Sequence, residues 1–384
     1  MDRDELSAWL RLVLTPRIGP GTARQLLAAL ASPQAIFEAS PQTLLSIVPA
    51  REAKALASVP EGLAEQVEQT LAWLQGEPAT EGAERALLTL ADTRYPPSLL
   101  QTADPPLLLF AHGRLDRLTR PAVAVVGSRS PTPQGKDNAY AFAKALSQAG
   151  VTVVSGLAQG VDGAAHEGAL DAGSGSEADD VGGTIAVVGT GLDRVYPRAH
   201  LPLAHRIASQ GLMLSEFLLG TPPLPGNFPK RNRIVAGLTR GTLVVEAAVQ
   251  SGSLITARLA AEMGREVLAI PGSIHAPQSR GCHALIKQGA KLVETAQDVL
   301  DELNLDVTVR PLASAPDADG DAEAGSPRQD PVLAVMGFDP VSQEALSART
   351  GMGPAELGAR LLELELTGQV ARLPGQLFQR MGQG

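Results

Sequence analysis

Apolar residues recur at two different spacings along this chain of 384 residues. Near the N-terminus they follow the 3.6-residue spacing of a helix that buries one face, and this pattern runs through residues 1–80. The first positions spaced in this way are Leu6, Trp9, Leu10, Val13 and Leu14. Helical spacing returns in residues 331–384. We therefore expect helical domains at 1–80 and 331–384.

The middle of the chain has a different pattern, in which short apolar, β-branched runs alternate with helical stretches over residues 121–303. This alternation is typical of a parallel sheet covered by helices on both faces. The predicted strands are Ala122–Val126, Val151–Val154, Thr184–Val188, Leu212–Leu214, Thr242–Val245 and Glu266–Ile270, with Lys291–Val293 as an edge strand. A proline-rich connection over residues 92–120 leads into this region, so the core domain is expected at 92–303.

Two segments lack apolar periodicity. Residues 308–330 include the string Ala315-Pro316-Asp317-Ala318-Asp319-Gly320-Asp321 and are expected to form a disordered linker. An acidic, glycine- and serine-rich stretch at 173–183 interrupts the core and is expected to be a mobile loop.

Nearly every predicted strand of the core ends in small or turn-forming residues. Gly127 and Ser128 follow the first strand, and Ser155 and Gly156 end the second. In an open parallel sheet the loops at the carboxyl ends of the strands line the ligand crevice, where the N–H groups of helix N-termini attract anions. The pattern therefore predicts an anion site at this edge, although turns of purely structural purpose would give the same residues.

Charge is distributed unevenly along the chain. The net charge is −9, of which residues 301–384 alone carry −7. Between residues 194 and 240 the balance is reversed, because one acid, Glu216, stands against seven bases. The bases are Arg194, Arg198, Arg206, Lys230, Arg231, Arg233 and Arg240. A local basic groove suits a polyanion, since salt screens distant charges more than near ones; a solvated basic face is the alternative.

Composition excludes several classes of protein. The single cysteine, Cys282, excludes an intrachain disulfide and a zinc site built on paired cysteines. No apolar run approaches the ~18 residues of a membrane-spanning helix, and the first residues are too acidic for a secretory signal. We expect a soluble, cytoplasmic protein that has no contact with a membrane.

The common catalytic and cofactor motifs are incomplete in this sequence. Gly135-Lys136 resembles the end of a phosphate-binding Walker loop, but Ser130 and Asp137 occupy two of its required positions. Gly189-Thr190-Gly191 begins a dinucleotide fingerprint that Arg194 then breaks. The histidines have no metal-binding spacing. We therefore expect no cofactor, no metal and no catalytic residues, and we interpret His166 as a helix-borne histidine that bonds to the backbone rather than as a general base.

Two polar strings remain for anion binding. In Gly127-Ser128-Arg129 the glycine permits close backbone approach, the serine can donate to a phosphate, and the arginine supplies a forked cation. The string Phe228-Pro229-Lys230-Arg231-Asn232-Arg233 places three cations and an amide just before an apolar helix (Ile234, Val235, Leu238), with Pro229 near the first helical turn. Such a density of like charges favours a bound anion. The alternative is that these arginines pair with Glu216 and Glu246.

Strings at seven places resemble the DNA processing protein A family of bacteria. In chain order they are Val125–Arg129, Ser155–His166, Gly191–Pro197, Phe228–Ile234, Val245–Ala247, Ser251–Ala257 and Ile270–Ser273. The match as a whole covers roughly residues 92–300 in the family's order. The sequence departs from the family's pattern in its acidic loop at 173–183 and at His200, where asparagine is common.

The resemblance implies an α/β fold with an extended Rossmann-like core, which binds single-stranded DNA in a positive pocket. It also implies a homodimer that helps to load the RecA recombinase onto DNA during natural transformation. The residues that it suggests for DNA binding are Gly127, Ser128, Arg129, Ser155, Gly156, Arg198, Lys230, Arg231, Asn232, Arg233, Gly252 and Ser253. A self-association surface is expected near Leu285, Ile286 and Leu292, unless these residues belong to the core.

The flanking domains have motifs of their own. Ile18 to Arg24, followed by two leucines, resembles a helix-hairpin-helix segment, which can contact a DNA backbone or serve only in helix packing. The order of elements predicted for residues 331–384 resembles a winged helix. Its helix at 354–367 carries Glu356, Glu363 and Glu365 against Arg360 alone, so we expect protein contact rather than DNA contact there.

Two rival functions use the same features. The first is a Rossmann-like nucleotide hydrolase with Glu246 or Asp162 as general base, which lacks a nucleophile–base pair or a metal set in the sequence. The second is a regulator of double-stranded DNA that acts through its terminal winged helix. Aromatic residues make up only 3% of the chain, so we expect DNA binding to depend strongly on salt and little on base stacking or sequence.

Overall fold

The computed structural model describes residues 1–77, 80–173, 181–274, 276–305, 330–336 and 340–381. The expected linker (308–330, except Asp330) and most of the acidic loop (174–180) lie outside the described residues. Among the residues that the structure describes, none of the helices combines the length and the apolar character needed to cross a lipid bilayer.

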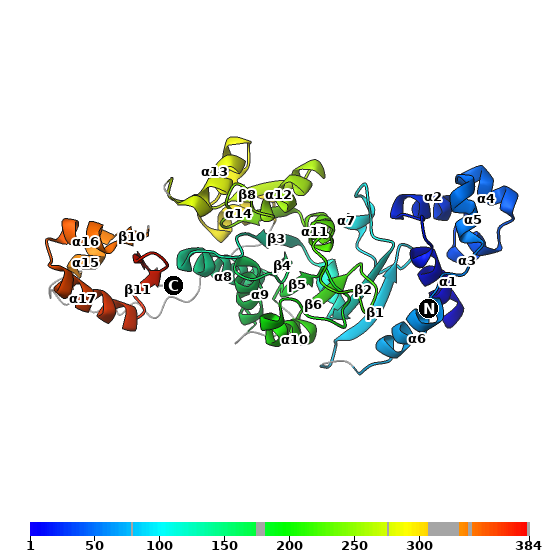
Figure 1. Cartoon of the computed structure of the whole chain (residues 1–384), viewed down its shortest axis with the longest axis horizontal. Coiled ribbons are helices and arrows are strands. Elements are labelled where there is room, and N and C mark those ends of the chain that lie inside the picture. Colours follow the sequence, from blue (N-terminus) through cyan, green and yellow to red (C-terminus); the bar gives the residue numbers. More distant parts are fainter. Residues whose placement is uncertain (78–79, 174–180, 275, 306–329, 337–339, 382–384) are drawn as a thin grey trace.

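Six helices form the N-terminal region, as the apolar spacing predicts (Figure 1). They are α1 (Arg3–Leu14), α2 (Pro20–Leu30), α3 (Pro33–Glu38), α4 (Pro41–Ile47), α5 (Ala50–Leu56) and α6 (Leu63–Leu74). Side chains of Asp2, Ser32 and Ser40 accept hydrogen bonds from the first turns of α1, α3 and α4, and proline begins α2, α3 and α4. These residues fix where the helices start, because they satisfy or remove backbone donors that a helix leaves free.

Nine strands of the described chain form one sheet, in the order β1-β2-β6-β5-β4-β3-β7-β8-β9. The strands from β6 to β9 in this order are parallel, whereas β1 pairs with β2, and β2 with β6, in antiparallel fashion. The parallel strands are β3 (Ala122–Val126), β4 (Thr152–Ser155), β5 (Thr184–Val187), β6 (Leu212–Ser215), β7 (Gly241–Val244), β8 (Glu266–Ala269) and β9 (Lys291–Leu292). Both ends of each predicted strand lie within one residue of these bounds.

The hairpin of β1 (Glu84–Thr89) and β2 (Leu108–Gly113) was not predicted. β1 lies between the ranges expected for the first two domains, and β2 lies in the stretch expected to be a proline-rich connection. The prolines flank these strands instead of interrupting them, and the short helix α7 (Pro97–Leu100) lies between the two. Alternate residues of the hairpin face different cores: Leu88 and Leu109 pack against the sheet domain, while Leu87 and Phe110 pack against the N-terminal helices.

Helices cover both faces of the parallel strands, as the apolar runs predict. One face packs against α8 (Pro133–Gln148), α9 (Val161–Asp171), α10 (Leu201–Gln210) and α14 (Ala296–Glu302). The other packs against α11 (Asn227–Leu238), α12 (Ser253–Glu262) and α13 (Arg280–Lys287). Short 3-10 turns occur at η1 (Leu115–Thr119), η2 (Arg198–His200) and η3 (Pro277–Ser279). Leu285 and Ile286 pack against the core, whereas Leu292 is exposed.

The C-terminal unit has a small core of its own. It consists of α15 (Pro331–Met336), β10 (Val341–Ser342), α16 (Gln343–Thr350), α17 (Pro354–Leu366), β11 (Val370–Leu373) and β12 (Leu377–Arg380). The strands form a three-stranded sheet in the order β10-β12-β11. Helices followed by a β-hairpin are the arrangement predicted for a winged helix.

Candidate functional site

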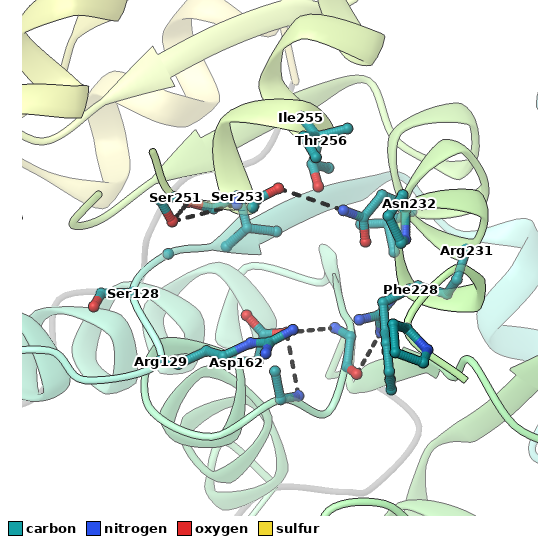
Figure 2. A pocket seen from close by; sticks show the side chains of 18 of the residues that line it. Ser128, Arg129, Asp162, Phe228, Arg231, Asn232, Ser251, Ser253, Ile255 and Thr256 are labelled. Carbon is teal, nitrogen blue, oxygen red and sulfur yellow. Dashed lines mark hydrogen bonds between the residues drawn. The ribbon is translucent and has the colours of Figure 1, made fainter. Parts of the chain in front are cut away.

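A pocket of about 700 Å³ lies at the carboxyl ends of β3, β4 and β7 (Figure 2). The chain continues from β3 to β4 on one side and from β7 to β8 on the other, so the direction of winding reverses between β3 and β7. Such a reversal separates the two loops that follow these strands and leaves a crevice between them. Residues 127–130 after β3 line this crevice, together with Ala248 and residues 250–253 at the start of α12.

The loop after β3 is held against the end of β7. The backbone N–H of Ser128 donates to the carbonyl of Glu246 at 2.7 Å. The Glu246 carboxylate accepts hydrogen bonds from the N–H and the hydroxyl of Thr132, whose Oγ1 in turn caps α8 at Gly135. Gly127 is needed here, because a Cβ would come within 2.7 Å of Val161 and 2.9 Å of the Glu246 carbonyl. These contacts leave Arg129 exposed at the pocket.

The loop after β4 is fixed by buried polar groups. Asp162 accepts hydrogen bonds from the N–H groups of Gly156 and Ala158, and Arg231 donates to the Gly156 carbonyl. Leu157 has a positive φ of 57°, a strained conformation for this residue. Its N–H donates to Nε2 of His166, so this strained turn is held from several sides.

Burial shifts the pKa values of these groups. It raises the pKa of the Asp162 carboxyl, although the charge of Arg231 acts against this. It also lowers the pKa of the Arg231 guanidinium, and nearby Arg129 adds to that effect. Burial, with the charges of His200 and Arg231, lowers the pKa of His166 to about 3. Its Nδ1 lies 2.7 Å from the Thr184 hydroxyl, so His166 is a neutral structural residue, as predicted.

The basic string after Phe228 lies inside a helix, and this corrects the prediction that it precedes one. α11 begins at Asn227, and successive helical residues point about 100° apart. Arg231 is buried and also donates to the Val187 carbonyl, while Lys230 is exposed. Arg233 turns away to pair with Glu216 and with Asp104. One part of the alternative interpretation is therefore correct, because Arg233 pairs with Glu216. The other part is not seen, because the Glu246 carboxylate accepts hydrogen bonds from Thr132.

Eight of the twelve residues suggested for DNA binding line the pocket: Gly127, Ser128, Arg129, Gly156, Arg231, Asn232, Gly252 and Ser253. Ser155, Arg198, Lys230 and Arg233 are not among its lining residues. The buried Ser155 hydroxyl donates to the Val125 carbonyl, whereas Arg198 is exposed on η2. Asn232 reaches across the pocket, where its amide nitrogen lies 3.5 Å from the Gly252 carbonyl.

Two aromatic residues at the pocket were missed. The rings of Tyr196 and Phe228 lie 5.6 Å apart, and the Arg129 guanidinium lies 5.9 Å from the centre of the Phe228 ring. Tyr196 is 49% exposed. Both residues lie in the strings that carry the family resemblance, but the low aromatic content of the chain led us to discount them.

Both candidate general bases of the hydrolase hypothesis hold backbone segments of the pocket in place. The Glu246 carboxylate is engaged by Thr132, and the Asp162 carboxylate by two backbone N–H groups. Within the described residues, no cluster of histidine, cysteine, aspartate or glutamate side chains could hold a metal ion. The pocket therefore offers hydrogen-bond donors, one exposed guanidinium and aromatic surface.

Arg24 of the helix-hairpin-helix segment contacts the sheet domain. Its guanidinium pairs with Asp104 at 2.7 Å and donates to the carbonyls of Ala103 and Pro105. Asp104 also pairs with Arg233 of α11. This part of the segment therefore serves in packing.

Comparison with known proteins agrees with the family suggested by the motifs. The model of the family "DNA recombination-mediator protein A" matches residues 86–304, and that of the "DprA winged helix domain" matches residues 315–376. Protein Smf of Escherichia coli (strain K12) is 41% identical over 332 residues, which are 85% of this chain and 83% of that protein. DNA processing protein DprA of Streptococcus pneumoniae (strain ATCC BAA-255 / R6) is 50% identical over 214 residues, 56% of this chain and 73% of that protein.

Two solved structures have the same fold. The X-ray structure of DprA from Streptococcus pneumoniae is 38% identical, with a TM-score of 0.64 over 79% of this chain and 98% of that one. DprA from Helicobacter pylori, whose structure is described as giving insight into a unique single-stranded DNA binding mode, is 31% identical. Its TM-score is 0.51 over 58% of this chain and 97% of that one.

Proposed function

Because the chain belongs to the DNA recombination-mediator protein A family, also called DprA or Smf, we propose that its pocket binds single-stranded DNA and that the bound protein helps to load the RecA recombinase. One observation carries this proposal. The exposed Arg129 guanidinium lies in the pocket between the loops after β3 and β7, beside the aromatic rings of Phe228 and Tyr196.

The pocket combines the two features by which proteins hold unpaired strands. The guanidinium and the N–H groups at the sheet edge attract phosphates, while Tyr196 and Phe228 offer faces on which bases stack. In a duplex the bases are already paired and stacked inside, so they cannot reach such faces. We therefore expect a strong preference for single strands with little dependence on sequence.

The twelve suggested residues then divide into different roles. Arg129 contacts phosphate directly, and exposed Lys230 and Arg198 add positive charge beyond the pocket. Ser128, Asn232 and Ser253 offer polar side chains to the strand, and the glycines at 127, 156 and 252 allow its close approach. Ser155, Arg231 and Arg233 position the surrounding loops and α11 rather than touch DNA.

The protein acts as a mediator and not as an enzyme in this proposal. The engaged states of Glu246 and Asp162 support this view. We place the protein in the cytoplasm, as a homodimer that takes part in natural transformation. A dimer would join two short sites into one longer track and thereby raise the avidity for long strands.

Removal of Arg129 tests the proposed contact. For Arg129→Ala we predict weaker binding of an oligo(dT) and a log–log salt slope reduced by ~0.7, the value for one released counterion on a single strand. Fluorescence anisotropy over a series of salt concentrations measures both. Arg51→Ala is the matched control, because it removes the same charge from an exposed site on α5. Equal slopes for wild type and Arg129→Ala would show that Arg129 does not contact the strand.

A further inference from the structure

The last helix of the winged-helix unit, α17, is the second helix of the helix-turn-helix pair α16–α17, and its charge is unsuited to a DNA groove. In a helix-turn-helix protein the second helix enters the major groove, between two rows of phosphates. On α17 the exposed charged residues Glu356, Glu363 and Glu365 are all acidic. The guanidinium of Arg360 is engaged by Asp330 and Glu363. This helix would therefore repel phosphates.

The same helix has two apolar faces. Leu357, Leu361 and Leu364 are buried in the core of the unit. The opposite face has a second apolar stripe, which consists of Ala355, Ala359, Leu362 and Leu366. These four residues are separated by four, three and four positions, so they form one line along a helix.

Nothing in the described chain covers this stripe. Leu362 is 56% exposed, and Leu366 is 80% exposed, more than any other exposed large apolar residue of the described chain. Single exposed leucines are ordinary on protein surfaces, but a continuous apolar line indicates a contact surface. The spacing is that of the seam along which two helices of a coiled coil pack.

The residues beside the stripe decide which helix fits it. Glu356 and Glu363 lie on one side and Glu365 on the other, the positions from which charges select partners in coiled coils. A second copy of α17 would bring carboxylates against carboxylates. A partner with lysine or arginine beside its apolar seam would instead neutralise them.

We propose that the stripe Ala355–Ala359–Leu362–Leu366, with its acidic borders, docks a basic amphipathic helix of a partner protein. The winged-helix unit is then the protein-binding arm of a molecule whose core holds DNA. This site is independent of the pocket in the sheet domain, so either assignment can fail without the other.

A peptide-display experiment on the full-length protein tests the proposal. The probe is a phage library of one helical scaffold, with leucine fixed at the seam positions and the flanking positions varied among lysine, glutamate and glutamine. We expect enrichment of lysine at the flanks. Selected peptides should bind the double variant Leu362→Ser, Leu366→Ser at least tenfold more weakly. The matched control is Leu45→Ser, which changes a 53% exposed leucine on α4 and should bind like wild type.

Several results would overturn the proposal. Enrichment of glutamate, a lack of charge preference, or equal binding to the double variant would each show that the stripe is not the docking site for a basic helix. A change of oligomeric state in the double variant, seen by sedimentation, would identify a second copy as the occupant. Loss of duplex DNA binding in the double variant would identify α17 as a DNA-reading helix.

Discussion

Arg231 and Arg233 lie two residues apart on α11 and have different surroundings. Arg231 donates to the carbonyls of Gly156 and Val187 and is 4% exposed, while Arg233 pairs with Glu216 and Asp104. Arg129, from a loop, is the exposed arginine among the pocket-lining residues. A guanidinium group therefore has a different role at each position: Arg231 fixes a loop of the pocket, Arg233 anchors α11 to neighbouring carboxylates, and Arg129 is open to a ligand.

Loss of Arg231 should be costly for folding. Arg231→Met leaves Asp162 as a buried charge without its opposite charge, which should lower the free energy of unfolding by ~3 kcal/mol. Asp162→Asn in the same chain removes that charge while it keeps an acceptor for the loop, so the double variant should regain part of the loss. Urea unfolding with an unchanged m-value measures both effects. A cost below ~1 kcal/mol for Arg231→Met would argue against a positioning role.

His166 should make stability depend on pH. Its pKa in the folded protein is about 3, whereas an unfolded histidine has a pKa of ~6.5, so the unfolded chain binds more protons between these values. The contribution of neutral His166 to the free energy of unfolding is fully present above pH ~6.5. As the pH is lowered below this value, that free energy falls by up to ~1.4 kcal/mol per pH unit. His166→Gln should have a shallower dependence in urea unfolding at pH 4.5–7. If the free energy of unfolding had the same pH dependence in wild type and His166→Gln, the assignment of His166 as a buried neutral histidine would be contradicted.

At the scale of single elements, sequence patterns predicted most of the sheet because its parallel strands are short, apolar and bounded by glycine or serine. Two failures have physical causes. β1 and β2 lie near prolines that suggest a loop, and their residues pack alternately against the sheet domain and the N-terminal helices, contacts that are distant in sequence. The string from Phe228 to Arg233 is strongly polar, so it was placed just before the apolar helix, whereas α11 begins at Asn227 and contains the whole string.

The start of α8 shows how one cap serves both an element and the site. Thr132→Ala removes the cap on Gly135 and a hydrogen bond to Glu246, which should cost ~1 kcal/mol of stability. It should also weaken DNA binding, because the loop from Gly127 to Thr132 loses an anchor. Ser40→Ala, which removes the cap of α4, is the control and should lower stability without affecting binding. Equal DNA affinities in the two variants would show that the loop does not need this anchor.

At the scale of the whole molecule, the site could be predicted only in part. Motifs placed glycines, serines and arginines at the carboxyl edge of the sheet, and eight of those residues do line one pocket. The sequence could not show which side chains meet across long separations, such as Arg231 and Gly156, which are 75 residues apart. It also hid the meeting of Tyr196 with Phe228, because a low aromatic content says nothing about where the few rings lie.

The net charge of the chain also did not indicate whether it binds DNA, because what matters is where the charges lie in the folded protein. The chain carries −9 in total, yet residues 301–384, which include the carboxylates of α17, account for −7 of this, whereas the pocket presents Arg129. Because salt screens charges beyond ~8 Å, a DNA strand at the pocket responds mainly to the nearby cations.

A crosslinking map tests the central claim most directly. Full-length protein is irradiated with a short oligo(dT) that contains a photoreactive thymine, and the modified residues are identified by mass spectrometry. We predict adducts at Tyr196 and Phe228, whose yield falls in Arg129→Ala as its binding weakens. Adducts confined to residues 18–24 or to α17, with Arg129→Ala binding as tightly as wild type, would contradict the assignment of this pocket to single-stranded DNA.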